Sequence, residues 1–275
     1  MADAVAPPPE LLERARRMRD GQVTPADTRD AATIALLRDG ASGPEVYLLR
    51  RVRAMAFAGG MHVFPGGSVD PADAATETAW AGPPASAWAQ AFGCDEPLAR
   101  ALVCAAVRET FEESGVLLAG SSPDQVLDDV STDEWEAERV ALEARELSLS
   151  ELLARRALVL RADLLRPLAH WITPEVEPKR FDTRFFLARM PEGQACREVG
   201  GEADQRVWVR PVDALADGLR MLPPTAVALR DLASYADVEG ALAAHRTITP
   251  VLPRLVVADD ESVEFLLPGD AGYPA

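Results

Sequence analysis

The sequence predicts a single α/β or α+β domain, because β-forming segments alternate with amphipathic helical segments along the chain. Two apolar segments, 31–37 and 45–50, are separated by a Gly/Asp/Pro turn, which predicts a β-hairpin. Segment 97–114 repeats its apolar residues every three or four positions, which predicts a helix ending at Gly115. There is no internal repeat, so one domain with inserted helices accounts for the 275 residues.

Turn signals and periodicity predict the other elements. Residues 1–28 are polar and contain prolines, which is typical of an N-terminal arm with one short helix. Four glycines and one proline within 58–67 exclude a helix there and indicate a loop with a short strand. Further helices or strands are expected at 132–147, 150–156, 180–189, 206–209 and within 224–246, with a terminal hairpin formed by 254–257 and 262–267.

Composition excludes several classes of protein. The chain has 28 Lys+Arg against 44 Asp+Glu, a net charge of −16, which argues against nucleic acid as a partner. No apolar stretch is long enough to predict a membrane helix, and the first residues lack the pattern of a signal peptide. Three cysteines without metal-ligand spacing predict reduced thiols in a cytoplasm. The preference for Arg over Lys and the many Ala residues favour a bacterial source.

The most informative segment is 108–116, which reads Arg-Glu-Thr-Phe-Glu-Glu-Ser-Gly-Val. On a helix, Glu109 and Glu113 lie four residues apart on one face, and Glu112 lies beside them. Like charges at this spacing repel one another, and a hard divalent cation would turn that cost into a binding site. The ordinary alternative is a solvated acidic helix end.

These residues resemble the signature of the Nudix hydrolases, which reads Gly, five residues, Glu, seven residues and Arg-Glu-(apolar)-x-Glu-Glu-x-Gly-(apolar). The second half of the signature is matched by Arg108, Glu109, Glu112, Glu113, Gly115 and Val116, with Thr110 where an aliphatic residue is usual. The first half is matched by Phe-Pro-Gly-Gly at 64–67, with Asp73 where the family has Glu. Asp73 and Arg108 are 35 positions apart where the pattern has 8, so about 27 residues are inserted.

An insertion inside the signature is a trait of the coenzyme A diphosphatase-like branch of the family. Further similarity to this branch lies in segments 55–67, 170–174, 180–186 and 266–270. The resemblance implies an α/β/α sandwich with a mixed sheet and helical insertions. It places the arm at 1–28 and the Nudix domain at 29–275, with insertions at about 74–97 and 120–165.

The resemblance also implies roles for individual residues. Mg²⁺ or Mn²⁺ would be held by Glu109, Glu112, Glu113 and the carbonyl of Gly67. Arg108 would orient a carboxylate of the signature, with Asp73 as a possible partner. The general base is either Glu109 or a loop acid, Glu202 with Glu198 behind it.

The remaining site residues concern the substrate. Arg50, Arg51 and Arg53 could hold an outer phosphate by bidentate contacts, and Gly66 would belong to the same site. The equally open alternative is that these arginines are simply basic residues at the end of a strand.

The resemblance implies metal-dependent hydrolysis of a nucleoside diphosphate linked to another moiety. The favoured substrate is coenzyme A or acyl-CoA, cut to 3′,5′-ADP and (acyl-)phosphopantetheine. The coenzyme A signature of related enzymes has an Arg where this chain has Ala56, so ADP-ribose, NADH and dinucleoside polyphosphates stay open. A catalytically silent ligand sensor is the alternative from another class, although such proteins typically lose signature carboxylates. The family also suggests a homodimer.

Two interpretations concern packing rather than chemistry. Residues 135–147 are dense in Glu and Arg, which favours a solvated helix stabilised by i,i+4 ion pairs. Trp171, Phe185 and Phe186 are expected in the core.

Overall fold

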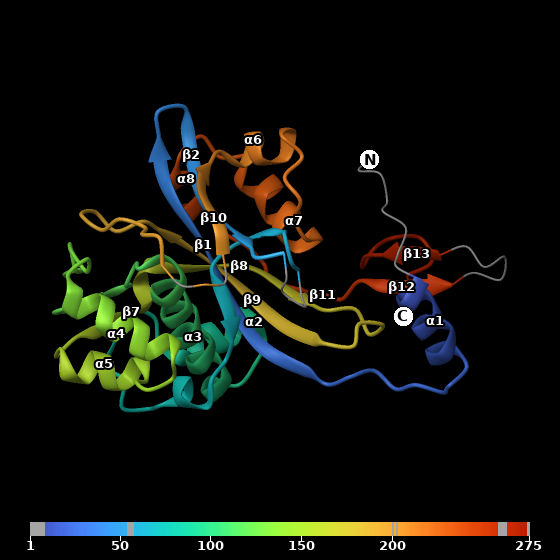
Figure 1. Ribbon diagram of the computed structural model, residues 1–275, viewed down its shortest axis with the longest axis horizontal. Helices are drawn as coiled ribbons and strands as arrows, with labels where there is room; N and C mark the ends of the chain where they lie inside the picture. Colours follow the sequence, from blue (N-terminus) through green and yellow to red (C-terminus); the bar gives the residue numbers. More distant parts are fainter. Residues whose placement is uncertain (1–8, 54–57, 200, 202, 258–262, 274–275) are drawn as a thin grey trace.

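A central mixed sheet separates two groups of helices in the computed structural model, which describes residues 9–53, 58–199, 201, 203–257 and 263–273 (Figure 1). The strand order is β10-β2-β1-β9-β8-β11, where β1 and β9 are parallel, as are β8 and β11. Two short strands extend it: β3 pairs with β2, and β4 pairs with β1. The strands are β1 (Thr28–Gly40), β2 (Gly43–Arg51), β3 (His62–Val63), β4 (Gly66–Ser68), β8 (Leu165–Ile172), β9 (Arg180–Arg189), β10 (Ala203–Val209) and β11 (Pro250–Val251).

One face of the sheet is covered by α3 (Glu96–Ser114) and its neighbours α2 (Ala85–Phe92), α4 (Asp133–Glu143) and α5 (Leu149–Arg155). Side chains alternate along β1, so Ile34 and Leu36 point to this face. The backbone of α3 starts and stops at defined residues. Asp95 accepts a hydrogen bond from the Leu98 amide, and Gly115 closes the helix at a φ of 72°.

The opposite face is covered by three short helices near the end of the chain, as Figure 1 shows. They are α6 (Pro211–Ala216), α7 (Pro223–Leu232) and α8 (Val238–Ala243). The residues of β1 that alternate with the first set, Ala35 and Leu37, are fully buried against them. Both faces of β1 are therefore in the core, and that explains its continuous apolar sequence.

A small second sheet joins the two segments that the sequence predicts as insertions. Its strand order is β5-β7-β6. Strand β5 (Trp80–Ala81) lies in segment 74–97 and β7 (Val159–Arg161) in segment 120–165, while β6 (Ala119–Gly120) lies at the beginning of the latter segment. The short 3₁₀ helices η1 (Pro71–Ala74) and η2 (Ala162–Leu164) flank it. The pairing of β5 with β7 thus joins segments 74–97 and 120–165 on the α3 side of the central sheet.

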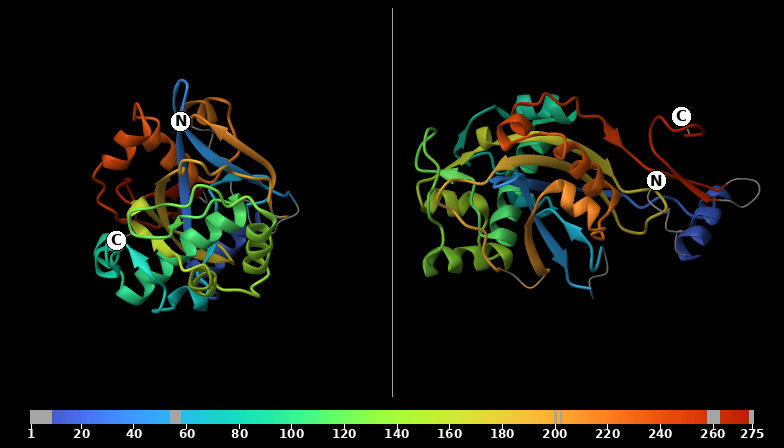
Figure 2. Two further views of the ribbon diagram at one scale, coloured as in Figure 1. Left: turned by 90° about the vertical axis from the view of Figure 1, so that its left-hand side faces the viewer. Right: turned by 90° about the horizontal axis from the view of Figure 1, so that it is seen from above.

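The two ends of the described chain meet away from the central sheet. Helix α1 (Pro9–Arg19) packs against the antiparallel ribbon of β12 (Arg254–Val257) and β13 (Val263–Leu266), beyond one end of the sandwich (Figure 2). Within the described chain, no helix has the length and apolar character needed to cross a bilayer.

Most predicted elements are confirmed, including the first hairpin, the α3 helix, β9 and the terminal hairpin. The helices α2 and α6 and the strand β8 are not predicted, since their sequences carry no clear period. The interpretation of 135–147 as a solvated face is wrong, because Trp135, Arg139 and Leu142 are buried. The ion pairs that it invokes are nonetheless present, between Arg139 and both Glu136 and Glu143. Trp171, Phe185 and Phe186 lie in the core as expected.

Phe186 tests the core on the α3 side. It is fully buried, and its ring lies 5.0 Å from that of Phe92 and 5.6 Å from that of Trp88. We expect Phe186→Ala to lower the free energy of unfolding by about 3 to 5 kcal/mol, because a cavity replaces these contacts. Chemical denaturation measures this, with Phe265→Ala as the exposed-site control. A loss below about 1 kcal/mol would contradict this account of the core.

Candidate active site

The glycine loop is pinned to the C-terminal part of α3. Gly66 and Gly67 lie on β4, which pairs antiparallel with Thr33 and Ala32 of β1. The Thr33 hydroxyl donates to the Pro65 carbonyl oxygen at 2.5 Å, and the Gly66 amide donates to Glu113 Oε2 at 2.7 Å. The loop is therefore held by the sheet on one side and by a signature carboxylate on the other.

Both glycines are required by close approach. A Cβ on Gly66 would overlap the Ala32 carbonyl oxygen and the Thr33 backbone. A Cβ on Gly67 would overlap the carboxylate of Glu109. The predicted metal ligands Gly67 and Glu109 are thus in direct proximity, although 42 residues separate them in the sequence.

Arg108 joins the acidic residues into one network. Its Nε and Nη2 donate to the two oxygens of Asp73 at 3.0 and 2.9 Å. Its Nη1 donates to Glu109 at 2.8 Å and to Glu112 at 3.2 Å. Nη2 also donates to the Ser68 carbonyl oxygen at 3.0 Å. The guanidinium thus contacts both halves of the signature, and the partnership with Asp73 is present.

Asp73 is in place because η1 holds it there. Its carboxylate accepts from the Asp70 amide at 2.8 Å, and Asp70 accepts from the Ala72 amide in return as part of a capping box. Only 3% of Asp73 is exposed, so its charge is compensated almost entirely by Arg108 and this amide. The insertion therefore begins after a residue that already belongs to the site.

Negative charge at the site exceeds what Arg108 compensates. Burial, followed by the nearby charge of Glu109, raises the pKa of Glu112 to about 7. A hard divalent cation would relieve this repulsion, and carboxylate and carbonyl oxygens are the ligands that Mg²⁺ and Mn²⁺ prefer. Within the described ranges no three acidic, His or Cys side chains converge as a ready metal cluster, since Arg108 draws Glu109 and Glu112 toward its own nitrogen. The chemistry of the donors fits such an ion.

The predicted substrate arginines lie at the end of β2, next to the glycine loop. The Arg51 amide donates to the Met61 carbonyl oxygen at 3.0 Å, and Arg50 pairs with His62 of β3 in register. The Arg50 guanidinium binds Asp204 of β10 at 2.7 Å. That ion pair turns Arg50 toward β10, while Arg53 is exposed.

The two loop acids proposed as general base are Glu202 and Glu198. Glu202 lies outside the described residues, as does Ala56. Glu198 is exposed and lies near Tyr47, whose pKa is raised by burial and, to a lesser degree, by Cys196, Glu113 and Glu198. Tyr47 therefore lies within electrostatic reach of both Glu198 and the Glu113 end of the acidic network.

One contributor to the site is not among the predicted residues. Arg139 of α4 donates to the carbonyl oxygen of Glu112 at 2.8 Å. The spacing of Trp135, Arg139 and Leu142 at i, i+4 and i+7 is the signal of a buried helix face, and it is available in the sequence.

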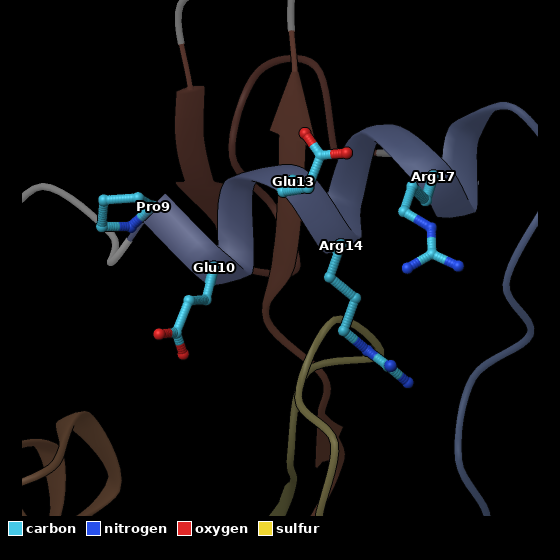
Figure 3. A pocket seen from close by; sticks show the side chains of 5 residues that line it. All are labelled: Pro9, Glu10, Glu13, Arg14 and Arg17. Atoms are coloured by element: carbon cyan, nitrogen blue, oxygen red, sulfur yellow. The ribbon is translucent and has the colours of Figure 1, made fainter.

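A surface hollow away from these residues carries no predicted function. Pro9, Glu10, Glu13, Arg14 and Arg17 line it along α1, with Glu10 and Glu13 directed to different sides of the helix (Figure 3). None of the predicted site residues takes part.

Known proteins match the chain over the region of this site. The model of the NUDT19 Nudix domain matches residues 87–224, half of the chain. The acyl-coenzyme A diphosphatase NUDT19 of Xenopus laevis is 25% identical, covering 86% of this chain and 73% of that protein. The acyl-coenzyme A diphosphatase NUDT19 of Gallus gallus is 28% identical, covering 90% of this chain and 80% of that protein. A solved NUDIX hydrolase from Alicyclobacillus acidocaldarius is 30% identical, with a TM-score of 0.69 over 81% of this chain and 98% of that one.

The chain belongs to the Nudix hydrolases. The matched region of the Nudix domain contains Arg108 and all three signature glutamates, whereas the glycine loop and Asp73 precede it. The likeness to the Alicyclobacillus structure confirms the predicted Nudix fold. Nudix hydrolases generally depend on a divalent metal, which agrees with the donor chemistry found here.

The two loop glycines should respond differently to substitution. In Gly66→Ala the new methyl meets backbone, so we expect a loss of about 2 kcal/mol or more in the free energy of unfolding. In Gly67→Ala it meets a carboxylate that can swing away, so we expect stability to change by less than about 1 kcal/mol while Glu109 is displaced. Denaturation of both variants and a structure of the second measure this. Equal destabilisation by the two substitutions would be evidence against the described packing.

Proposed function

We propose that this Nudix hydrolase cleaves the diphosphate of coenzyme A or acyl-CoA to give 3′,5′-ADP and (acyl-)phosphopantetheine. The observation that carries the reaction class is the convergence of Gly67, Asp73, Arg108 and the signature glutamates on one end of α3. The substrate is supported by the two vertebrate relatives, both named acyl-coenzyme A diphosphatases.

Different residues of the chain would bind the metal ion and orient its ligands. Glu109, Glu112, Glu113 and the Gly67 carbonyl would hold Mg²⁺ or Mn²⁺, which when bound neutralises phosphate oxygens and lowers the pKa of water. Arg108 keeps two of these carboxylates in place by donating hydrogen bonds to them. Water attacks one phosphorus, the bridging P–O bond breaks, and the other phosphate leaves.

Two roles depend on residues at the rim of the site. Glu109 or a loop acid, Glu202 or Glu198, would accept the proton of the attacking water. Glu198 and Glu113 both act on the pKa of Tyr47, which supports the loop candidate. Arg50, Arg51 and Arg53, together with the Gly66 backbone, would bind the outer phosphates, Arg50 after exchanging Asp204 for the substrate.

Further properties stay predictions. ADP-ribose, NADH and dinucleoside polyphosphates are the alternative substrates, and a silent sensor is the alternative function. A small-molecule nucleoside diphosphate as the partner, a homodimer and a cytoplasmic, bacterial setting complete the proposal. Light scattering on the purified chain tests the dimer.

Product analysis tests the proposed reaction. With Mg²⁺ or Mn²⁺ and coenzyme A, we expect mass spectrometry to detect 3′,5′-ADP and phosphopantetheine. Glu113→Gln keeps the acceptor for the Gly66 amide but removes the charge, so turnover should fall about 100-fold or more with the fold intact. Glu146→Gln, the same change on an exposed residue, is the matched control. Cleavage of ADP-ribose or NADH but not of coenzyme A would show that the proposed substrate is wrong. Mn²⁺ binding without cleavage of any of these compounds would favour the alternative function of a ligand sensor.

The raised pKa of Glu112 predicts a pH dependence. A carboxyl group whose folded pKa exceeds its unfolded value keeps a proton in the folded state that the unfolded chain has lost. Stability of the metal-free protein should therefore fall as pH rises from the usual Glu value of 4.5 to about 7, by about 1 kcal/mol per pH unit.

Mn²⁺ competes with that proton, so the affinity for Mn²⁺ should rise up to about tenfold per pH unit below 7 and level off above it. Denaturation and calorimetry between pH 5 and 8 measure both effects. Glu112→Gln should flatten the stability profile, and an unchanged profile in this variant would assign the proton to another group.

A further inference from the structure

An arginine from the second insertion reaches the backbone of the signature helix. Arg139 lies on α4, only 3% of it is exposed, and its Nη1 donates to the Glu112 carbonyl oxygen at 2.8 Å. This carbonyl lies in the last turn of α3, where carbonyl groups lack the usual amide partner four residues on. The Val116 amide, which would be that partner, donates to the Ser114 hydroxyl instead. Arg139 therefore satisfies an acceptor that the helix leaves open.

The guanidinium of Arg139 is itself fixed by two carboxylates of its own helix. It binds Glu136 at 2.8 Å and Glu143 at 2.9 Å, and these lie one turn before and one turn after it. Glu136 also binds Arg197 at 3.1 Å, and the Arg197 amide donates to the Ser114 carbonyl oxygen at 2.9 Å. Arg139 and Arg197, which both bind Glu136, thus donate hydrogen bonds to two carbonyl oxygens in the last turn of α3, those of Glu112 and Ser114.

Glu112 is consequently held from both ends. Its carboxylate accepts from Arg108 and its carbonyl oxygen from Arg139. The C-terminus of a helix carries partial negative charge, which opposes the three glutamates gathered there. The buried guanidinium of Arg139 at this terminus offsets the repulsion between the helix end and the glutamates. It also limits how far the last turn can unwind when the carboxylates repel one another.

We infer that Arg139 is a positioning residue, which fixes the last turn of α3 so that the signature glutamates are prearranged for a divalent metal. The inference rests on the proposed function only in taking these glutamates as the metal ligands. It gives the segment 120–165 a role in catalysis through its own helix α4, without contact with substrate.

The fold should tolerate loss of this contact. Apolar contacts between α3 and α4 persist without Arg139, since the rings of Phe111 and Trp135 pack edge to face at 6.2 Å. Arg156 provides a matched control. It binds Glu138 of α4 and stacks over Trp135 at 4.4 Å, and the partners described for its guanidinium are all on α4.

The experiment compares Arg139→Met with Arg156→Met by calorimetry with Mn²⁺ alone, without substrate. We expect Arg139→Met to weaken Mn²⁺ binding about tenfold or more, as is typical when a partner of a metal ligand is lost. Arg156→Met should stay within about twofold of the wild type, and Arg139→Lys, which keeps one donor and the charge, should fall between. Hydrogen exchange of the metal-free chain should show faster exchange at residues 110–114 in Arg139→Met only.

Three outcomes would overturn the inference: equal Mn²⁺ affinities in Arg139→Met and the wild type, equal losses in both Met variants, or a wild type that binds no Mn²⁺. Should Arg139→Met not fold, Glu136→Gln loosens both arginines at a half-buried residue. An unchanged Mn²⁺ affinity in that variant would equally overturn the inference. Failure of the proposed substrate is distinct. A chain that binds Mn²⁺, responds to Arg139→Met and leaves coenzyme A intact keeps this inference and loses that substrate.

Discussion

The structure of the candidate site depends on the buried guanidinium of Arg108. Four carboxylates and a glycine loop meet at one end of α3, and the negative charge they bring would drive them apart in the absence of a cation. Arg108 supplies a fixed positive charge to Asp73, Glu109 and Glu112 and also binds the Ser68 carbonyl oxygen. Its planar fork allows this, because five donors in one plane can serve several acceptors at once. A lysine could not replace it.

This arrangement explains how the signature tolerates its insertion. The two residues that the family pattern places eight positions apart are here joined by a folded segment, whose strand β5 pairs with β7 of the second predicted insertion. Its two ends are anchored independently, Asp73 by the capping box of η1 and Arg108 by its place in α3. The bidentate ion pair between Asp73 and Arg108 brings the two halves of the signature together, as the shorter spacing of the family pattern would do. The segments predicted as insertions thus pack on one side of α3.

Much of this could be predicted from the sequence, and the failures have physical causes. The α3 helix and the first hairpin are encoded locally, by period, cap and turn residues, so they are predictable. The strand β8 contains Pro167 and depends on pairing with β9, and α2 consists largely of Ala and aromatic residues packed on Phe186. Both are stabilised by tertiary contacts that no local pattern records.

The site shows the same division. The roles proposed for the signature residues come from the family resemblance, and the Asp73–Arg108 pair is anticipated although the two residues are 35 positions apart. Arg139 is missed because a helix rich in Glu and Arg is ordinarily solvated, although Trp135 and Leu142 lie on the same face of the helix as Arg139 and are buried with it. Charge alone misleads in such a helix, whereas the spacing of its apolar residues does not.

A chain with a net charge of −16 must also accept a substrate that is a polyanion. Long-range repulsion slows the encounter and is screened beyond about 10 Å at ordinary ionic strength. Close contacts therefore decide binding, and the arginines at the end of β2 are the residues that we propose for such contacts. Arg50 is already paired with Asp204, so a phosphate has to compete with a carboxylate for the guanidinium. That competition favours a doubly charged phosphate group over a singly charged one.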